Sequence, residues 1–390
     1  MELSQRLAQI SPSLTLTISN QARELKEKGT KVWDFSAGEP DFDTPLPIKE
    51  AAIRALQAGK TKYGAVTGVA ALKQAITDRL YQDQNLRYAP DQVIVTNGGK
   101  QSLYNLMICL LNPGDEVIIP SPYWVSYPEM VKLAGAKPVL LRASWEQDYK
   151  ITPAQLSAQI TARTKLFVFN SPANPTGSVY SPQEVEAIAR VLEAHPQVWI
   201  VADEIYSKIV YPPAVHHSIA HFLPDRTLIS SGFAKAYAMT GWRVGYLVGD
   251  REVIKATAKL QSHSTSNVCT FAQYGALHAL IDSQDSVEQM RQSFLQRREL
   301  CYRLLSGLSK LRCPLPQGAF YLFPNIAETG LGSLEFCARL LAEKQVALVP
   351  GIAFGADDSV RFSYATDPLT IEEGCRRIGE FMADLFPLEA

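Results

Sequence analysis

The sequence predicts an α/β fold, with a large domain whose mostly parallel, seven-stranded sheet is covered by helices and a smaller α+β domain built from both chain ends. The first observation behind this prediction is an alternation of short β-rich runs with amphipathic stretches through the middle of the chain. The second is a change of pattern after about residue 285, where a long charged helical stretch begins. The length of 390 residues is enough for one large and one small domain.

The large domain is expected to contain seven strands separated by helices. Gly98 and Gly99 precede a predicted helix over residues 100–111, and another helix is predicted near residues 123–134. Apolar strands that alternate with helices are typical of a parallel sheet buried on both faces. The seven strands are expected over residues 91–96, 116–119, 138–141, 165–170, 198–203, 227–231 and 243–248.

The smaller domain is expected to combine three helices with short strands. The helices are predicted at residues 286–308, 334–344 and 371–386, and the strands at residues 320–323, at a run ending at Val349, and at residues 360–364. We assign residues 46–285 to the large domain, and residues 1–45 together with 286–390 to the small one.

Charge and composition exclude several classes of partner. The 38 Lys and Arg residues balance 39 Asp and Glu residues, which argues against nucleic acid or an anionic membrane as the main partner. The longest apolar runs are only strand-sized, and the N-terminus lacks the apolar run of a signal peptide. The six cysteines form no CxxC pair and the six histidines form no ligand set. We therefore expect reduced thiols, no metal site and a cytoplasmic location.

Polar residues follow three of the predicted strands, where ligands of open α/β sheets bind. Gly99 and Lys100 begin a helix whose backbone N–H groups could hold a phosphate, although an ordinary glycine turn explains this pattern at least as well. Asn174 lies in a proline-rich turn, which could equally be a surface turn. Asp203 leaves an apolar strand, so it either caps a helix or needs a cationic partner such as a pyridinium nitrogen. No GxGxxG or GxxxxGK[ST] run indicates a nucleotide.

Lys235 and Arg243 lie eight residues apart in a run of small and apolar residues. Apolar surroundings or nearby cations lower the pKa of a lysine amine, which can then form a Schiff base with an aldehyde. An arginine presented beside glycines suits a phosphate. An aldehyde and a phosphate on one small molecule indicate pyridoxal 5'-phosphate as the cofactor.

This run resembles the lysine-attachment motif of the class I and II aminotransferases. From about residue 11 to residue 377 the chain resembles a fold-type I, class I aminotransferase, and in particular the bacterial-type aspartate aminotransferases. The matching runs lie at residues 37–42, 62–64, 121–124, 170–177, 203–206, 232–245 and 361–365. One departure is Gly232, where many relatives carry a serine that contacts phosphate.

The resemblance implies a role for each matching residue. Lys235, Asp203 and Tyr206 are the expected catalytic residues: Lys235 attaches the cofactor, Asp203 pairs with its ring nitrogen, and Tyr206 with Asn174 hydrogen-bonds its phenolic oxygen. Trp124 is expected to stack on the ring, and the expected phosphate contacts are Tyr63, Gly99, Lys100 and Arg243. Arg361 is expected to bind the substrate α-carboxylate, in a substrate site that also includes Gly38, Trp124 and Asn174.

The implied activity moves the amino group of an L-amino acid, with aspartate favoured, to a 2-oxo acid such as 2-oxoglutarate in two half-reactions. Lys100, with Ser13 and Thr15, could bind a distal carboxylate, although Lys100 could equally be solvated. Alternatives are an aromatic or prephenate aminotransferase, a carbon–sulfur β-lyase, and a non-catalytic ligand-sensing module. The lack of a basic residue near Ser11 favours aspartate over prephenate, and the lack of a preceding DNA-binding extension disfavours the sensing module. In this family the tyrosine that matches Tyr63 comes from the neighbouring subunit, so the resemblance implies a homodimer with shared active sites.

Overall fold

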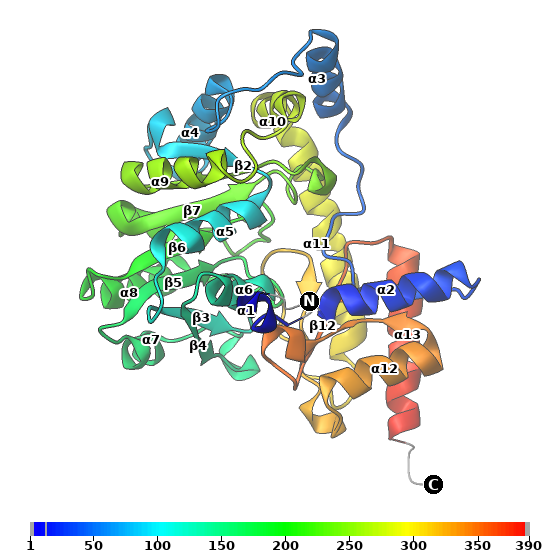
Figure 1. The fold of residues 1–390 in the computed structure, drawn as a ribbon. Coiled ribbons are helices and arrows are strands. Elements are labelled where there is room, and N and C mark those ends of the chain that lie inside the picture. Colours follow the sequence, from blue (N-terminus) through cyan, green and yellow to red (C-terminus); the bar gives the residue numbers. More distant parts are fainter. Residues whose placement is uncertain (1–3, 12–13, 387–390) are drawn as a thin grey trace.

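A computed structural model describes residues 4–11 and 14–386. Its large sheet has seven strands in the order β2-β8-β7-β6-β5-β3-β4 (Figure 1). Only β8 pairs antiparallel with its neighbours, so the prediction of a mostly parallel seven-stranded sheet is confirmed. The strands are β2 (Val93–Thr96), β3 (Glu116–Ser121), β4 (Lys137–Arg142), β5 (Thr164–Asn170), β6 (Trp199–Asp203), β7 (Thr227–Gly232) and β8 (Gly245–Val248).

Helices cover both faces of this sheet, because the strands are apolar on both sides. In β3, Ile118 joins one hydrophobic core, whereas Val117 and Ile119 join another on the opposite face. The first core includes α4 (Ala70–Gln84), α7 (Pro153–Gln159), α8 (Pro182–Glu193) and α10 (Thr270–Asp282), and α3 (Leu46–Gln57) packs on α10. The second includes α5 (Gly99–Leu110), α6 (Ser126–Leu133) and α9 (Arg251–Ser262).

A second region has its own core and two small sheets. One sheet is antiparallel, in the order β11-β12-β9, and the other pairs β1 with β10 in parallel. Its strands are β1 (Trp33–Asp34), β9 (Tyr321–Leu322), β10 (Val346–Ala347), β11 (Val349–Pro350) and β12 (Val360–Ser363). Its helices are α2 (Leu14–Glu27), α11 (Gln284–Ser306), α12 (Ser333–Lys344) and α13 (Pro368–Leu385), while the short α1 (Gln5–Ala8) lies against α6.

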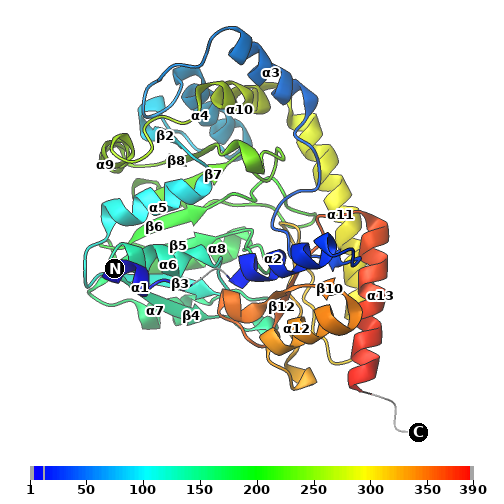
Figure 2. The same cartoon turned by 45° about the vertical axis from the view of Figure 1, so that its right-hand side comes forward.

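Both ends of the chain contribute to this second region, as Figure 2 shows for α2 beside the elements that follow α11. The aromatic rings of Phe35 and Phe362, from the two ends of the sequence, stack at a centroid distance of 4.1 Å. The exact domain boundaries at residues 45 and 285 stay a prediction. None of the described helices is both long and apolar enough to span a bilayer.

Two local expectations differ from the structure. The single strand expected to end at Val349 is two short strands, because β10 pairs with β1 whereas β11 pairs with β12. The last strand of the large sheet begins at Gly245 rather than at Arg243. Arg243 instead has a left-handed backbone with φ of 55°, which directs its guanidinium towards the carbonyl of Asn97 just before α5.

Candidate active site

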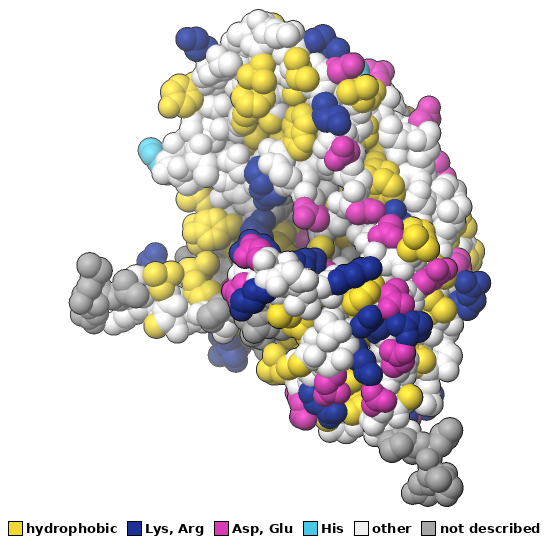
Figure 3. Space-filling view, turned by 90° about the vertical axis from the view of Figure 1, so that its right-hand side faces the viewer, with side chains coloured by type: hydrophobic (Ala, Val, Ile, Leu, Met, Phe, Trp, Pro, Cys, Tyr) yellow, Lys and Arg dark blue, Asp and Glu magenta, His cyan; other side chains and the backbone are white. Residues whose placement is uncertain are grey.

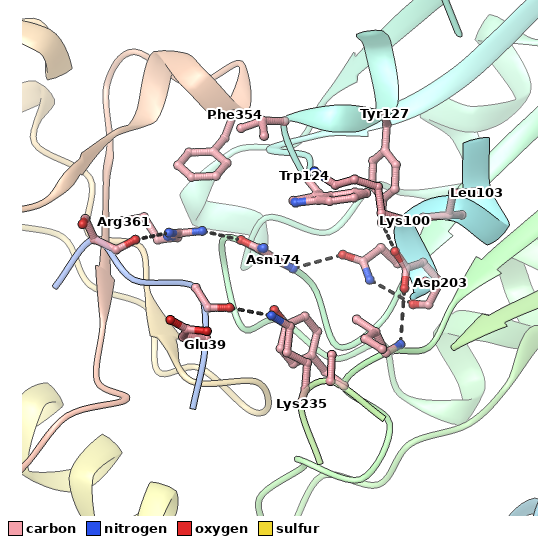
Figure 4. Close-up of a pocket in the computed structure, with 18 of the residues that line it drawn as sticks. Glu39, Lys100, Leu103, Trp124, Tyr127, Asn174, Asp203, Lys235, Phe354 and Arg361 are labelled. Atoms are coloured by element: carbon pink, nitrogen blue, oxygen red, sulfur yellow. Dashed lines mark hydrogen bonds between the residues drawn. The ribbon is translucent and has the colours of Figure 1, made fainter. Parts of the chain in front are cut away.

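One cavity of about 540 Å³ lies at the carboxyl ends of β5 and β6, between the large sheet and β12 of the second region. Neighbouring parallel strands end here together, with Asn170 opposite Asp203 and Asp203 opposite Ser230. Figure 4 shows Arg361 and Asp203 at opposite ends of the cavity, with Trp124 and Lys235 on opposite sides between them. The sheet therefore places the polar ends of β5 and β6 at one cavity.

Lys235 enters the cavity from the loop between β7 and β8. Its Nζ atom donates a hydrogen bond of 2.5 Å to the carbonyl oxygen of Gly38, on the segment that follows β1. Burial, and after it the positive charge of Arg361, lower the pKa of Lys235 to about 8. The amine is therefore neutral at mildly alkaline pH, as a nucleophile or proton acceptor requires.

Asp203 is the last residue of β6 and is 6% exposed. Its Oδ2 atom accepts a 2.6 Å hydrogen bond from the Tyr127 hydroxyl, and its Oδ1 atom accepts one from the backbone N–H of Ile205. Burial raises the pKa of Asp203 to about 6, although the Tyr127 hydrogen bond opposes this shift. Asp203 has no ion-pair partner among the described residues, so a cationic ligand atom would stabilise its charged form.

Arg361 lies on β12 and is 4% exposed. Its guanidinium donates to the Oδ1 atom of Asn174 at 3.1 Å and to the backbone oxygen of Ser36 at 2.7 Å. It lies over the rings of Tyr321 and Phe354, at 4.6 and 5.1 Å from their centroids. Within the described chain the buried Nε atom has no hydrogen-bond partner and the cation has no carboxylate partner. An uncompensated buried guanidinium favours an anionic ligand with two oxygens, such as a carboxylate.

The opposite end of the cavity is built from α5 and the loop that carries Arg243. Gly98, with φ of 80°, turns the chain into α5, so the first N–H groups of this helix face the cavity together with Lys100. A Cβ atom at Gly98 would lie 2.5 Å from Nη2 of Arg243, and one at Gly245 would lie 2.4 Å from the backbone nitrogen of Gly99. Glycines thus allow a helix N-terminus and a guanidinium to approach closely, which is a favourable arrangement for a phosphate.

Lys100 has a second neighbour besides the helix. Its Nζ atom lies 5.0 Å from the ring centroid of Trp124, and the Trp124 ring packs edge to face on Tyr127. Partial burial lowers the pKa of Lys100, and the nearby Arg243 contributes to the same shift. Trp124 lines the cavity and offers an aromatic surface to it.

Residues 30–378 match the family described as aminotransferase class I and II. The chain belongs to this family. It is 49% identical to an aspartate aminotransferase of Geobacillus stearothermophilus and 48% identical to an aspartate/prephenate aminotransferase of Cereibacter sphaeroides, each over 98% of this chain and 99% of the relative. A solved aspartate aminotransferase of Thermus thermophilus with maleate is 42% identical, with a TM-score of 0.94 over 97% of this chain and 99% of that one. The family and the fold indicated by the sequence are thus confirmed.

The cavity of this aminotransferase brings together almost all residues that the sequence singled out. Its lining includes Gly38, Gly99, Lys100, Trp124, Asn174, Asp203, Tyr206, Lys235, Arg243 and Arg361. Their individual roles stay predictions. Tyr63 does not line the cavity of the single chain, and it is 93% exposed. Ser13 lies outside the described residues, as does the side chain of Thr15.

The structure also explains Gly232, where the sequence departs from many relatives. In this aminotransferase Gly232 pairs with Gly245 in the antiparallel contact of β7 and β8. A Cβ atom at Gly232 would lie 2.8 Å from the Cα atom of Gly245 and 3.0 Å from the oxygen of Val244. Glycine is therefore the residue that fits this close strand contact.

Several residues of the aminotransferase site were missed by the sequence analysis. Tyr127 holds Asp203, Phe354 packs under Arg361, and Glu39 accepts a 2.7 Å hydrogen bond from the Thr240 hydroxyl at the rim of the cavity. Tyr127 lies three residues after Trp124 and packs edge to face on it, but its partner Asp203 is 76 residues away in the sequence. Glu39 lies in the matching run at residues 37–42, although no role was assigned to it, and no local pattern in the sequence marks Phe354.

Proposed function

We propose that this protein is a pyridoxal 5'-phosphate-dependent aspartate aminotransferase, which transfers the amino group of L-aspartate to 2-oxoglutarate. The observation that carries the proposal is that one cavity contains a lysine with a lowered pKa, a buried carboxylate and a buried arginine. Neither the carboxylate nor the arginine has an ion-pair partner in the described part of the chain. The names of the full-length relatives support the choice of aspartate.

The residues of the cavity fit this cofactor chemically. Lys235 offers an amine to an aldehyde, Asp203 a carboxylate to a ring nitrogen, and Trp124 an aromatic face to a ring. Arg243 and the N-terminus of α5 offer donors to a phosphate. The Oδ1 atom of Asn174 is taken by Arg361, which leaves its Nδ2 group to donate to a ligand oxygen. When bound, pyridoxal phosphate supplies an aldehyde and a ring that withdraws electrons.

The chain itself binds the substrate and moves a proton. Arg361 holds the α-carboxylate through two parallel hydrogen bonds, which orients the Cα–H bond of the amino acid. The Lys235 amine then accepts the proton from Cα and later returns one, as general base and then general acid. The negative charge of Asp203 stabilises a protonated ring nitrogen throughout. The same groups serve the second half-reaction in the reverse direction.

A second carboxylate on the substrate needs a second cation, and we assign this task to Lys100. Its Nζ atom lies beside Trp124 at the cavity wall, whereas Arg361 is already committed to the α-carboxylate. Prephenate is a second candidate substrate, because relatives named aspartate/prephenate aminotransferase are up to 48% identical over nearly the whole chain. Prephenate also carries two carboxylates, so the same pair of cations could hold it.

We further propose that the active unit is a homodimer to which each subunit contributes Tyr63. Exposed apolar side chains gather on and near α3, among them Leu46 at 61%, Ile53 at 51% and Leu56 at 43%. Figure 3 shows hydrophobic side chains gathered on the upper part of one face, above a hollow in its middle. A second copy that covers this surface would bury the apolar patch and place the exposed Tyr63 near a partner.

A panel of amino donors tests the proposed function. Purified protein with added pyridoxal phosphate is supplied with 2-oxoglutarate as the acceptor and with aspartate, tyrosine or alanine as the donor in separate reactions. Glutamate is supplied as the donor with prephenate as the acceptor in a further reaction. We expect kcat/KM for aspartate to exceed that for tyrosine and alanine. Release of pyruvate and ammonia from a cysteine-like substrate, without transfer to a 2-oxo acid, would instead identify a carbon–sulfur β-lyase. Absence of any amino transfer with every donor would refute the aminotransferase assignment.

A further inference from the structure

Tyr321 lies directly behind the active site without lining the cavity. It begins β9 in the second region and is fully buried. Its hydroxyl oxygen lies 2.8 Å from the hydroxyl oxygen of Tyr206, and the two rings meet edge to face. Its ring also supports the guanidinium of Arg361, at 4.6 Å from the ring centroid. One buried side chain thus contacts two of the residues that we assign to ligand binding.

The number of protons available shows which hydroxyl donates the hydrogen bond between Tyr321 and Tyr206. A tyrosine hydroxyl can donate only one hydrogen bond, although it can also accept. Tyr206 lines the cavity, whereas the Tyr321 hydroxyl has no hydrogen-bond partner among the described residues other than Tyr206. A buried hydroxyl that donates nowhere loses the free energy of one hydrogen bond. The arrangement that satisfies both groups has Tyr321 donating to Tyr206, while Tyr206 donates its own proton into the cavity.

We infer that Tyr321 is a positioning residue: its hydroxyl directs the proton of Tyr206 towards the phenolic oxygen of the cofactor, and its ring holds Arg361 in place for the substrate carboxylate. This inference rests on the proposed function, because it uses the cofactor oxygen as the acceptor. Tyr321 comes from β9 and Tyr206 from the segment after β6, so the contact also joins the two regions of the molecule.

A hydrogen-bond chain strengthens each of its members, because a hydroxyl whose oxygen accepts a hydrogen bond becomes a better hydrogen-bond donor. With Tyr321 present, Tyr206 withdraws more electron density from the phenolic oxygen of the cofactor. That oxygen then competes less strongly for the proton that it shares with the nitrogen of Lys235. The other charged or titratable groups that face the two hydroxyls are Asp203, Glu39, Lys235 and Arg361. They remain in place when only the Tyr321 hydroxyl is removed.

The variant Tyr321→Phe tests the hydroxyl, since it keeps the ring under Arg361. In the holoenzyme, absorbance of the bound cofactor is titrated with pH, without substrate. We expect the pH midpoint of this absorbance titration to move upwards by roughly 0.3 to 1 pH unit, because the cofactor oxygen then holds the shared proton more strongly. The expected shift is the scale of part of one hydrogen bond. The matched control is Tyr364→Phe, which removes another fully buried hydroxyl of the same region, bonded to the oxygen of Ala319 at 3.2 Å. Its midpoint should equal that of the unmodified enzyme.

A double-mutant cycle shows whether Tyr321 acts through Tyr206. If it does, Tyr321→Phe should add no further shift when Tyr206 is already phenylalanine. Equal midpoints for Tyr321→Phe and the unmodified holoenzyme, or equal shifts with and without the Tyr206 hydroxyl, would overturn the inference. Failure of the unmodified protein to bind pyridoxal phosphate would instead refute the proposed function, so the two failures are distinguishable.

The ring is tested separately with maleate, a dicarboxylate that has no amino group to transfer. Its dissociation constant is measured from the change in cofactor absorbance. Tyr321→Phe should leave this constant within about twofold, whereas Tyr321→Leu, which removes the aromatic surface under the cation, should raise it about 3- to 10-fold. Equal maleate affinity in the leucine variant, with its bound cofactor and thermal midpoint retained, would contradict the role of the ring.

Discussion

At the scale of single residues, the chemistry depends on buried charged groups that have hydrogen bonds but no ion-pair partner among the described residues. Lys235, Asp203 and Arg361 each occupy a buried position at which an ordinary protein would supply a counter-ion. Burial acts in opposite directions on the first two: it favours the neutral amine of Lys235 and the neutral carboxyl of Asp203. A ligand with an aldehyde, a basic nitrogen and an anion reacts with the amine and supplies the counter-charges for Asp203 and Arg361. Ligand binding therefore offsets the free-energy cost of burying these two charges.

The lowered pKa of Lys235 predicts a pH dependence for cofactor capture. Only the neutral amine attacks an aldehyde, and with a pKa of about 8 half of the amines are neutral at that pH, against less than about 1% for an ordinary lysine. The rate at which apoenzyme and pyridoxal phosphate form their absorbance band should therefore rise up to about pH 8 and then level off. Stopped-flow mixing between pH 7 and 10 measures it, and a rate still rising tenfold per unit at pH 9 would contradict the shift.

Lys235→Ala is expected to separate binding from catalysis. The variant keeps Asp203, Arg243 and the N-terminus of α5, so it should still bind pyridoxal phosphate without a covalent link. Turnover should fall by several powers of ten, because the residue that moves the proton is absent. Absorbance after dialysis and a steady-state assay give the two quantities, and a variant with the same absorbance band and activity as the unmodified protein would exclude Lys235 as the attachment residue.

The two cations of the substrate site should respond differently to mutation. Arg361→Lys keeps the charge but loses the planar fork, so kcat/KM should fall about 10²-fold or more for every amino acid, as expected if roughly 3 kcal/mol is lost. Lys100→Ala should reduce kcat/KM for aspartate and glutamate while sparing aromatic and aliphatic donors. The same donor panel measures both variants, and equal losses for all donors in Lys100→Ala would restrict Lys100 to cofactor binding.

The residues that could be identified from sequence were those whose neighbours along the chain already define their surroundings. Asp203 follows a buried strand, and Lys235 and Arg243 share one short run. Tyr127 and Tyr321 could not be assigned in this way, because their partners lie 76 and 115 residues away. A tyrosine in an apolar stretch is normally a core residue, and only the folded chain shows which hydroxyl reaches the site.

At the scale of elements, the alternation of strands and helices predicted the large sheet, but it could not predict the direction of β8, the strand next to the edge strand β2. β8 runs antiparallel to β7 because the chain returns through a loop instead of a crossover helix. The switch of the chain from β10 to β11 at Leu348 was also unpredictable, since both strands are short and apolar. Pairing partners far away in sequence decide such cases.

The turn into α5 yields a prediction at this scale. Gly98→Ala places a Cβ atom 2.5 Å from Nη2 of Arg243 and requires a positive φ angle, so the anion-binding end should distort. We expect the affinity for pyridoxal phosphate to fall at least about tenfold while the fold is kept. Gly241→Ala is the control, because a Cβ atom there meets nothing within 4 Å. Fluorescence titration of the apoenzymes gives both constants, and matching constants for the two variants would contradict this view of the turn.

At the scale of the whole molecule, the exposed Tyr63 and the apolar surface near α3 predict shared active sites. Tyr63→Ala and Lys235→Ala proteins should each have low activity. After the two proteins are mixed in equal amounts and exchange subunits, about half of the dimers should be heterodimers. Each heterodimer has one intact site, so about a quarter of all sites should recover activity. Activity per subunit after mixing measures this fraction. No recovery, with exchange verified by mass-tagged subunits, would show that Tyr63 does not serve a neighbouring site.

Lys235 and Arg243 belong to one short loop whose ends are tied by the pairing of Gly232 with Gly245. The separation between the amine and the guanidinium is therefore set within one loop of the large sheet, without a contribution from the second region. The loop therefore selects ligands by length. An aldehyde whose anionic arm is one bond shorter or longer cannot contact both the Lys235 amine and the Arg243 guanidinium. The enzyme should thus distinguish pyridoxal phosphate from close analogues by the distance between aldehyde and phosphate as well as by charge.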